Sequence, residues 1–315
     1  MKAAEERPVL SIIATVYNSA KIVAELVARI KSVVDAMGIA YEIILVDDGS
    51  RDDSAFFMEQ QSRDDLRVKS IILSRNFGQQ VAMSAGVHHA TGRFVLIMDG
   101  DLQNPPEAIP RLYQKVLEGY DIVYTSSPKK NDLFDSLTSW LFWKFLKFVV
   151  RADVAQSQLM MRIMTAEVAE YYRNYPEKIR TVAAITHDIG MNCAVILVEN
   201  QKRREGKSNY NTLKRMNLAI DVILDFSNRP LNFVFYLGGI IFLLTIGAAL
   251  YYLHSYLTQN TLPGFTSLAL LILLFGSINL ISIGVLARYV ANIYTEVKRR
   301  PLYFVRKSIN LPKKS

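Results

Sequence analysis

Two pairs of aspartates stand directly after apolar runs, and their types and spacing suit the binding of a cation. Asp47 and Asp48 follow "EIILV", and Asp99 and Asp101 follow "FVLIM" with one glycine between them. Carboxylates brought close together repel one another unless a cation or hydrogen-bond donors compensate them. Hard oxygen ligands of this kind suit Mg²⁺ or Mn²⁺. The alternative is an ordinary turn at each strand end, because Asp-Gly is common in turns.

The elements that would position these acids alternate between strand and helix patterns. Amphipathic helix patterns separate the strands, and "PPEAIPRLYQKVLEGY" starts a helix on proline, where a missing N–H costs nothing. Such alternation predicts an α/β fold with βαβ units and a mostly parallel sheet. Ligands of such sheets bind beyond the carboxyl ends of the strands, where both aspartate pairs fall. The strand patterns lie at residues 9–18, 41–50, 68–74, 93–101 and 121–126.

A long uncharged segment follows the α/β part. From Pro230 to Ala287 the chain has no Asp, Glu, Lys or Arg, and a polar turn, "TQNTLPG", divides this segment. Each side holds an apolar run, and about 20 residues are needed to cross a bilayer as a helix. We therefore predict two transmembrane helices, Leu231–Leu257 and Phe265–Ile293. The alternative is a buried helical hairpin in a soluble core.

The formal net charge of the 315-residue chain is +8, and basic residues flank the uncharged segment on both sides. The turn at 258–264 carries no charge. The positive-inside rule therefore places both termini in the cytoplasm and this turn outside. This distribution favours lipid headgroups over nucleic acid as the partner of the positive charge. The first residues lack the apolar region and cleavage site of a signal peptide.

Two further segments have the pattern of helices that lie in a membrane surface. The segment near 133–151 places apolar side chains on one helical face, with Trp140 and Trp143 typical of the headgroup zone. The segment near 210–227 repeats this pattern and leads into the first apolar run. The alternative for both is an ordinary amphipathic helix packed on a core. The one cysteine, Cys193, excludes an intrachain disulfide and is predicted to be a small core residue.

Several motifs together resemble the polyprenyl-phosphate glycosyltransferases. They are "IIATVYNSA", "EIILVDDGS", "RNFGQQVAMSAG", "DGDLQNPPE" and "REGKSNYN", followed by the two apolar runs. The resemblance extends over nearly the whole chain and includes bactoprenol glucosyltransferases, dolichyl-phosphate mannose synthases and the undecaprenyl-phosphate aminoarabinose transferase. "DGDLQNPPE" with the two-helix tail is specific to this family, whereas "DDGS" marks only the wider superfamily.

The resemblance implies a fold, a domain order and a reaction. It implies a family 2 catalytic domain of GT-A fold at 1–228, a transmembrane anchor at 229–294 and a basic cytoplasmic tail at 295–315. Such enzymes move a hexosyl or pentosyl group, with inversion, from a nucleotide diphosphate sugar to a polyprenyl phosphate. The implied donor is UDP-linked, the implied acceptor is undecaprenyl phosphate, and the implied location is the bacterial inner membrane. A homo-oligomer stays open, and nucleic acid is not an expected partner.

The resemblance also implies roles for particular residues. Asp99 and Asp101 match the DxD motif, which holds Mg²⁺ or Mn²⁺ on the donor diphosphate. The implied nucleotide-sugar site consists of Thr15, Val16, Tyr17, Asp47, Asp48, Asp99 and Gly100. Arg203 and Ser208 match the segment associated with the acceptor and donor phosphates, and Asp99, Asp101 and Arg203 are the implied catalytic residues.

The chemistry of two approaching anions also requires cations near the acceptor. A phosphate monoester with a second pKa of roughly 6 is mostly dianionic at neutral pH, so a strong general base is not required. Steering by Arg and Lys is required instead. For Lys129 and Lys130 the alternative is a solvated loop, and for the cluster near 202–207 it is a lipid-headgroup site. The candidate cations are Lys129, Lys130, Arg203, Arg204 and Lys207.

Two positions depart from the family pattern. Many relatives carry an aspartate where this chain has Gln156, and the usual lysine of "GESKY" is Asn209 here, with Lys207 two residues earlier. Two other functions stay open. A processive polysaccharide synthase would carry a Q-x-x-R-W motif and more membrane spans, neither of which occurs. A nucleotide-binding membrane scaffold without catalysis would fit the changes at Gln156 and Asn209.

Overall fold

The computed structural model describes residues 7–126, 158–175, 190–199, 264–298 and 300–311, with scattered residues between 240 and 254. The chain forms two compact units. The first comprises residues 1–140, 152–209 and 300–315, and it contains the sheet. The second comprises residues 141–151 and 210–299, and it contains the long apolar helix.

An eight-stranded sheet forms the first unit, in the order β7-β5-β6-β4-β1-β2-β3-β8. Strand β1 is parallel to β2 and β4, β2 to β3, and β5 to β7, whereas β6 and β8 run antiparallel to their neighbours. The predicted α/β fold with a mostly parallel sheet is confirmed, and β6, β7 and β8 are additions to it. The strands are β1 (Leu10–Val16), β2 (Tyr41–Asp47), β3 (Val68–Leu73), β4 (Phe94–Asp99), β5 (Ile122–Ser126), β6 (Gln158–Thr165), β7 (Cys193–Leu197) and β8 (Val305–Ile309).

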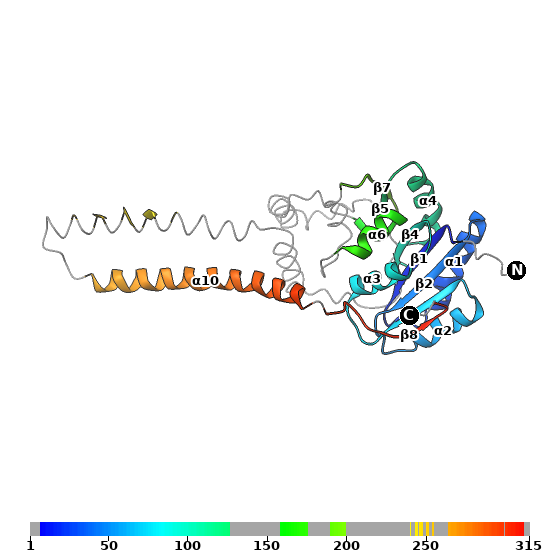
Figure 1. The fold of residues 1–315 in the computed structure, drawn as a ribbon, viewed down its shortest axis with the longest axis horizontal. Coiled ribbons are helices and arrows are strands. Elements are labelled where there is room, and N and C mark those ends of the chain that lie inside the picture. Colours follow the sequence, from blue (N-terminus) through cyan, green and yellow to red (C-terminus); the bar gives the residue numbers. More distant parts are fainter. Residues whose placement is uncertain are drawn as a thin grey trace. The chain divides into compact units, whose positions relative to one another are not determined.

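Helices cover both faces of the sheet and bury two apolar clusters. Helices α1, α2 and α4 pack on one face, and α3 and α6 pack on the other (Figure 1). Gly86 brings α3 close to the sheet, because a Cβ there would lie 2.4 Å from Cγ2 of Ile13. The helices are α1 (Val23–Met37), α2 (Ser54–Asp64), α3 (Gln79–His89), the 3-10 turn η1 (Pro106–Ala108), α4 (Ile109–Leu117), α6 (Ala166–Asn174) and α10 (Phe265–Val297).

A buried carboxylate ties the first residues of several strands together. Glu42 on β2 is 2% exposed and accepts hydrogen bonds from Ser11 Oγ, from Lys69 Nζ, and from Thr91 N at 2.7 Å. Burial raises the pKa of the Glu42 carboxyl, but the donors of Lys69, Ser11 and Thr91 outweigh burial and the pKa lies below its ordinary value. The charged form of Glu42 therefore stabilises the fold.

We expect Glu42→Gln to lower the free energy of unfolding by about 2 to 3 kcal/mol at pH 7, because Lys69 would lose its counter-charge in a largely buried place. A carboxyl whose pKa is depressed by folding stabilises the protein above its unfolded pKa. That stabilisation is lost as the pH falls through the folded pKa. The difference in thermal midpoint between wild type and variant should therefore shrink in acid. A difference that stays constant down to about pH 3 would contradict this role.

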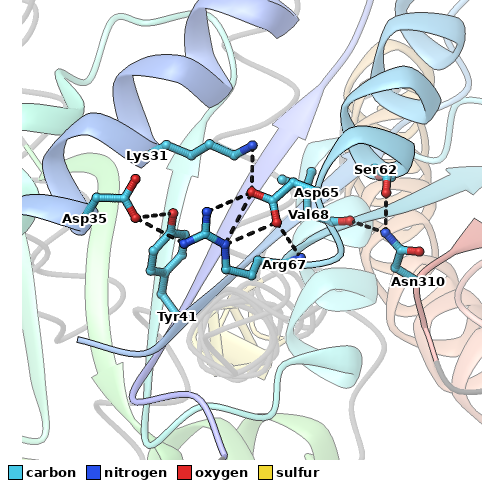
Figure 2. Close-up of polar contacts among 8 residues, drawn as sticks. All are labelled: Lys31, Asp35, Tyr41, Ser62, Asp65, Arg67, Val68 and Asn310. Atoms are coloured by element: carbon cyan, nitrogen blue, oxygen red, sulfur yellow. Dashed lines mark hydrogen bonds and ion pairs between the residues drawn. The ribbon is translucent and has the colours of Figure 1, made fainter. Parts of the chain in front are cut away.

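The segment after the apolar helix returns to the sheet as β8, which pairs antiparallel with β3. Lys307 Nζ lies 2.6 Å from Glu59 Oε2 on α2. The Asn310 amide donates to the Val68 carbonyl at 2.9 Å and to the Ser62 carbonyl. Figure 2 shows this amide beside the start of β3, near the ion cluster in which Asp65 binds Arg67 and Lys31. The sequence predicts only a basic tail here, and the strand is a finding of the structure.

The helix α10 of the second unit has 33 residues, a length of about 50 Å at 1.5 Å per residue. Its segment Leu274–Ala291 is apolar and unburied, and it is the one helix in the described part of the chain that is long and apolar enough to cross a membrane. The predicted interfacial helices near 133–151 and 210–227 lie outside the described residues, and so does most of the predicted span Leu231–Leu257. The described residues of that first span, such as Leu243 and Leu250, are helical and exposed.

The prediction for Cys193 was wrong. Cys193 is exposed at the first residue of β7, a strand at the edge of the sheet. Among the described strands, β7 has a neighbour on one side only, and the side chain of Cys193 is not enclosed by the core.

Candidate active site

The central strand β1 brings the two aspartate pairs to one edge of the sheet. In the register of the parallel strands, Val16 stands opposite Asp47 on β2, and Thr15 stands opposite Asp99 on β4. Gly100 N donates to the Thr15 carbonyl at 2.9 Å, and Asp48 N donates to the Val16 carbonyl at 3.0 Å. Both pairs therefore flank the carboxyl end of β1, where the sequence places them.

Gly100 allows the ends of β4 and β1 to approach closely. A Cβ on this residue would lie 2.5 Å from the Thr15 carbonyl oxygen, which is shorter than any ordinary contact. Any side chain here would push the strand ends apart. The glycine between Asp99 and Asp101 thus sets the position of the whole motif.

Asp47 and Asp48 are buried and hold the turns around them. Both oxygens of Asp47 accept from Ser50 N at 3.2 Å. Asp48 accepts from Phe77 N at 2.8 Å and from Gly78 N at 3.0 Å, which ties it to the loop before α3. Burial raises the pKa of both carboxyls despite these donors. These donors therefore do not fully compensate the burial of either carboxylate. Further hydrogen-bond donors from a ligand, such as the hydroxyl groups of a ribose or the N–H of a base, would stabilise the charged forms.

The loops after β1 and β2 are linked to one another. Asn18, at a φ of 48°, donates from its N–H to Ser50 Oγ and accepts from Arg51 N, both at 2.9 Å. Ser19 N donates to Ser54 Oγ at 2.9 Å. Tyr17 precedes this link and is 47% exposed, so its ring is accessible to a ligand.

Two amides hold the first aspartate of the DxD motif. Gln79 Nε2, at the first residue of α3, donates to Oδ1 of Asp99, and Asn104 Nδ2 donates to its Oδ2 at 3.3 Å. Asn104 is 2% exposed, and its own Oδ1 is buried without a hydrogen-bond partner in the described structure. The orientation of Asp99 is therefore set from both sides by neutral donors.

A strained turn positions the second aspartate of the motif. Oδ1 of Asp101 accepts from Gln103 N at 3.1 Å. Leu102 between them has a φ of 58°, a conformation that costs a non-glycine residue about 1 to 2 kcal/mol. Its side chain is fully buried in the core, which holds the turn in place. Such strain is found preferentially at functional sites.

The residues present fit a divalent cation that is shared with a ligand. In the described ranges, no group of three or more His, Cys, Asp or Glu side chains is gathered to hold a metal. Mg²⁺ commonly binds through one or two carboxylates and completes its shell with water and substrate phosphates. Asp99 and Asp101 supply such a partial set of hard oxygen ligands.

Three residues near Asp99 were not predicted from the sequence as site residues. They are Gln79 and Asn104, which donate to Asp99, and Arg162 on β6. The first two lie within "RNFGQQ" and "DGDLQNPPE", motifs that carry the family resemblance, and this membership was the only signal that could have found them. The predicted residues Lys129, Lys130, Gln156, Arg203, Arg204, Lys207, Ser208 and Asn209 lie outside the described residues.

Comparisons with known proteins agree with this geometry. The sequence profile described as "Glycosyl transferase family 2" matches residues 11–166. The chain is 35% identical over 299 residues to the uncharacterized glycosyltransferase sll0501 of Synechocystis, with 94% of each chain covered. This chain therefore belongs to glycosyl transferase family 2 and is a glycosyltransferase.

Solved structures share the fold at low sequence identity. Mannosyl-3-phosphoglycerate synthase from Rubrobacter xylanophilus matches with a TM-score of 0.54 and 17% identity, covering 71% of this chain and 75% of that one. Glucosyl-3-phosphoglycerate synthase from Mycobacterium tuberculosis, crystallised with Mn²⁺ and UDP-glucose, matches with a TM-score of 0.50 and 17% identity, covering 69% and 77%. These matches support the expected GT-A-like α/β fold.

Proposed function

We propose that this glycosyltransferase moves a sugar, with inversion at the anomeric carbon, from a UDP-linked donor to a membrane polyprenyl phosphate such as undecaprenyl phosphate. The product is a lipid-linked monosaccharide for the cell envelope. The observation that carries this proposal is the path of the chain. One continuous chain joins a family 2 site to an unburied apolar helix, α10, and then adds β8 to the catalytic sheet. Such a helix is expected where the acceptor is a lipid.

The donor half of the proposal uses the edge around β1. Asp47 and Asp48 would accept hydrogen bonds from the base and ribose, beside the exposed ring of Tyr17. Asp99 and Asp101 would hold Mg²⁺ or Mn²⁺, a cation that stabilises the charge gained by the leaving diphosphate. The M. tuberculosis synthase has been crystallised with Mn²⁺ and UDP-glucose, which supports a divalent cation and a UDP-linked sugar as the bound groups.

The acceptor half needs cations and not a strong base. A phosphate monoester has a second pKa of about 6, so the acceptor arrives with its nucleophilic oxygen already deprotonated. The cations then bring two anions together, a task for which the guanidinium group is well suited. We assign it to Arg203, Arg204 and Lys207, with Ser208 and Lys129 as further contacts. The same cluster would also bind anionic lipid headgroups.

The sheet pairing restricts the membrane topology. Because β8 follows α10 and pairs with β3, the segments before and after the apolar part belong to one folded unit. A chain that leaves a folded unit and returns to it crosses the bilayer an even number of times. This supports a second span at Leu231–Leu257. We place the catalytic unit and both termini in the cytoplasm, because basic residues flank the spans.

The variant Asn260→Cys, in a Cys193→Ser background, is therefore expected to react with a membrane-impermeant maleimide added to intact cells. Asn260 belongs to the uncharged turn that we place outside the cytoplasmic membrane. The matched control is Arg63→Cys in the same background, since Arg63 is exposed on α2 of the catalytic unit. The control should react only after lysis. Labelling of position 260 only after lysis would refute the topology.

Incubation of cell membranes with radiolabelled nucleotide sugars tests the proposed function against its two rivals. Label extracted into organic solvent as a lipid-linked monosaccharide supports the proposal. Label in a polymer would indicate a processive polysaccharide synthase, and the absence of transfer from any donor would indicate a nucleotide-binding scaffold.

A further inference from the structure

Arg162 on β6 is a buried cation with few partners. The residue is 6% exposed. One of its terminal nitrogens, Nη2, lies 3.5 Å from Met83 Sδ, and among the described residues its Nε has no hydrogen-bond partner. No ion pair joins it to a carboxylate in the described part of the chain. A buried guanidinium in this situation is costly, because desolvation is not offset by a paired charge.

The sheet places Arg162 on the same face as Asp99. Arg162 stands directly opposite Ile97 on β4, and residues opposite one another in adjacent strands project to the same face. Asp99 follows Ile97 by two residues, so it also projects to this face. Met83, which Arg162 contacts, lies on α3, the helix whose first residue donates to Asp99. Arg162 thus lies on the same face of the sheet as the first aspartate of the DxD motif, and its charge interacts with Tyr172, Tyr124 and Asp99.

We propose that Arg162 is a positioning residue that supplies a buried counter-charge to the loaded donor site. The inference rests on the proposed function, since it needs a nucleoside diphosphate at Asp99 and Asp101. The negative charges of two carboxylates and a diphosphate outnumber the charge of one divalent cation, and the diphosphate gains charge when the sugar leaves. A fixed cation inside the fold stabilises the complex of the aspartates, the divalent cation and the diphosphate. It does so at the expense of the stability of the protein without ligand.

Replacing Arg162 by methionine separates this role from a structural one. Methionine is flexible, apolar and close to arginine in length, so it would fill the site beside Met83. In the full chain purified in detergent, we expect Arg162→Met to raise the thermal midpoint measured without ligand. The Kd for UDP at saturating Mn²⁺, measured by calorimetry, should rise by about tenfold. Arg162→Lys keeps the charge and should bind UDP within about threefold of wild type.

Arg173→Met is the matched control on the neighbouring helix α6. Arg173 donates from Nε to the Val87 carbonyl at 2.9 Å and from Nη2 to the Ala90 carbonyl at 2.8 Å, at the end of α3 remote from Gln79. Its loss removes a charged donor from each of these two carbonyls, so the thermal midpoint should fall while the Kd for UDP stays unchanged. Arg162→Met should therefore raise the thermal midpoint and weaken UDP binding, whereas Arg173→Met should lower the midpoint and leave UDP binding unchanged.

Three results would overturn the proposal. A lower midpoint for Arg162→Met would show a structural cation, and unchanged UDP affinity would show that the charge does not serve the donor site. Equal loss of UDP affinity in Arg162→Lys and Arg162→Met would show that shape matters and charge does not. A wild-type chain that binds UDP but transfers no sugar to lipid phosphate would refute the proposed acceptor alone, because UDP binding involves no acceptor.

Discussion

Asp101→Asn is expected to reduce sugar transfer by about a thousandfold, equivalent to about 4 kcal/mol of transition-state stabilisation. Asn keeps the size of Asp101 and the Oδ1 acceptor that binds Gln103 N. It removes only the negative charge, so the turn at Leu102 should form and the protein should remain folded and membrane-bound. The variant would lose its hold on the metal, and the departing diphosphate would lose the charge that stabilises it.

The measurement is the initial rate of transfer as a function of Mn²⁺ concentration, with the thermal midpoint as a check on folding. Asp64→Asn is the matched control, because Asp64 is exposed at the last residue of α2. That control should transfer at the wild-type rate. Undiminished turnover in Asp101→Asn at limiting Mn²⁺ would show that the DxD assignment is wrong.

Gly49→Ala is expected to weaken UDP binding by about a hundredfold and to lower the thermal midpoint. Gly49 has a φ of 68°, and a Cβ there would lie 2.3 Å from the carbonyl carbon of Arg75. Backbone atoms at that distance must move, and the loop that they belong to donates Phe77 N and Gly78 N to Asp48. Displacement of the loop would leave a buried carboxylate without its donors, at a cost of about 1 to 3 kcal/mol.

Gly38→Ala separates the effect of the clash from that of backbone strain. Gly38 follows α1 with a φ of 64°, but a Cβ there would meet nothing within 4 Å. This control should lose about 1 to 2 kcal/mol of stability and bind UDP as wild type does. Equal effects of the two substitutions on UDP binding would mean that the contact between the Gly49 turn and the loop before α3 does not shape the nucleotide site.

The parts of the fold that could be predicted are those with strong local patterns. The apolar runs before Asp47 and Asp99 are buried strands of a parallel sheet, and this topology requires both to end at one edge. The alternation of strand and helix patterns was enough to predict that both aspartate pairs lie at the same edge of the sheet, and no distant contact had to be known. The roles assigned to these acids remain predictions that the variants above would test.

The parts that could not be predicted depend on pairing between distant segments. Strand β8, "VRKSI", is short and partly charged, as is common for an edge strand, and its partner β3 lies more than 200 residues earlier. Strand β6 carries Arg162 within an otherwise apolar run, and nothing local indicates that this cation projects to the same face of the sheet as Asp99. The amides of Gln79 and Asn104 carry no charge, so only the folded chain shows that they hold Asp99.

The most direct test of the account is the mass of the lipid product. The purified full chain, in detergent with Mn²⁺, would be given a mixture of nucleotide sugars together with undecaprenyl phosphate and 3-phosphoglycerate, the acceptor type named for the structural neighbours. We predict that mass spectrometry will find undecaprenyl phosphate carrying one sugar, with 3-phosphoglycerate unchanged. Glycosylated phosphoglycerate with unmodified lipid, or a lipid that carries a sugar chain, would contradict the account.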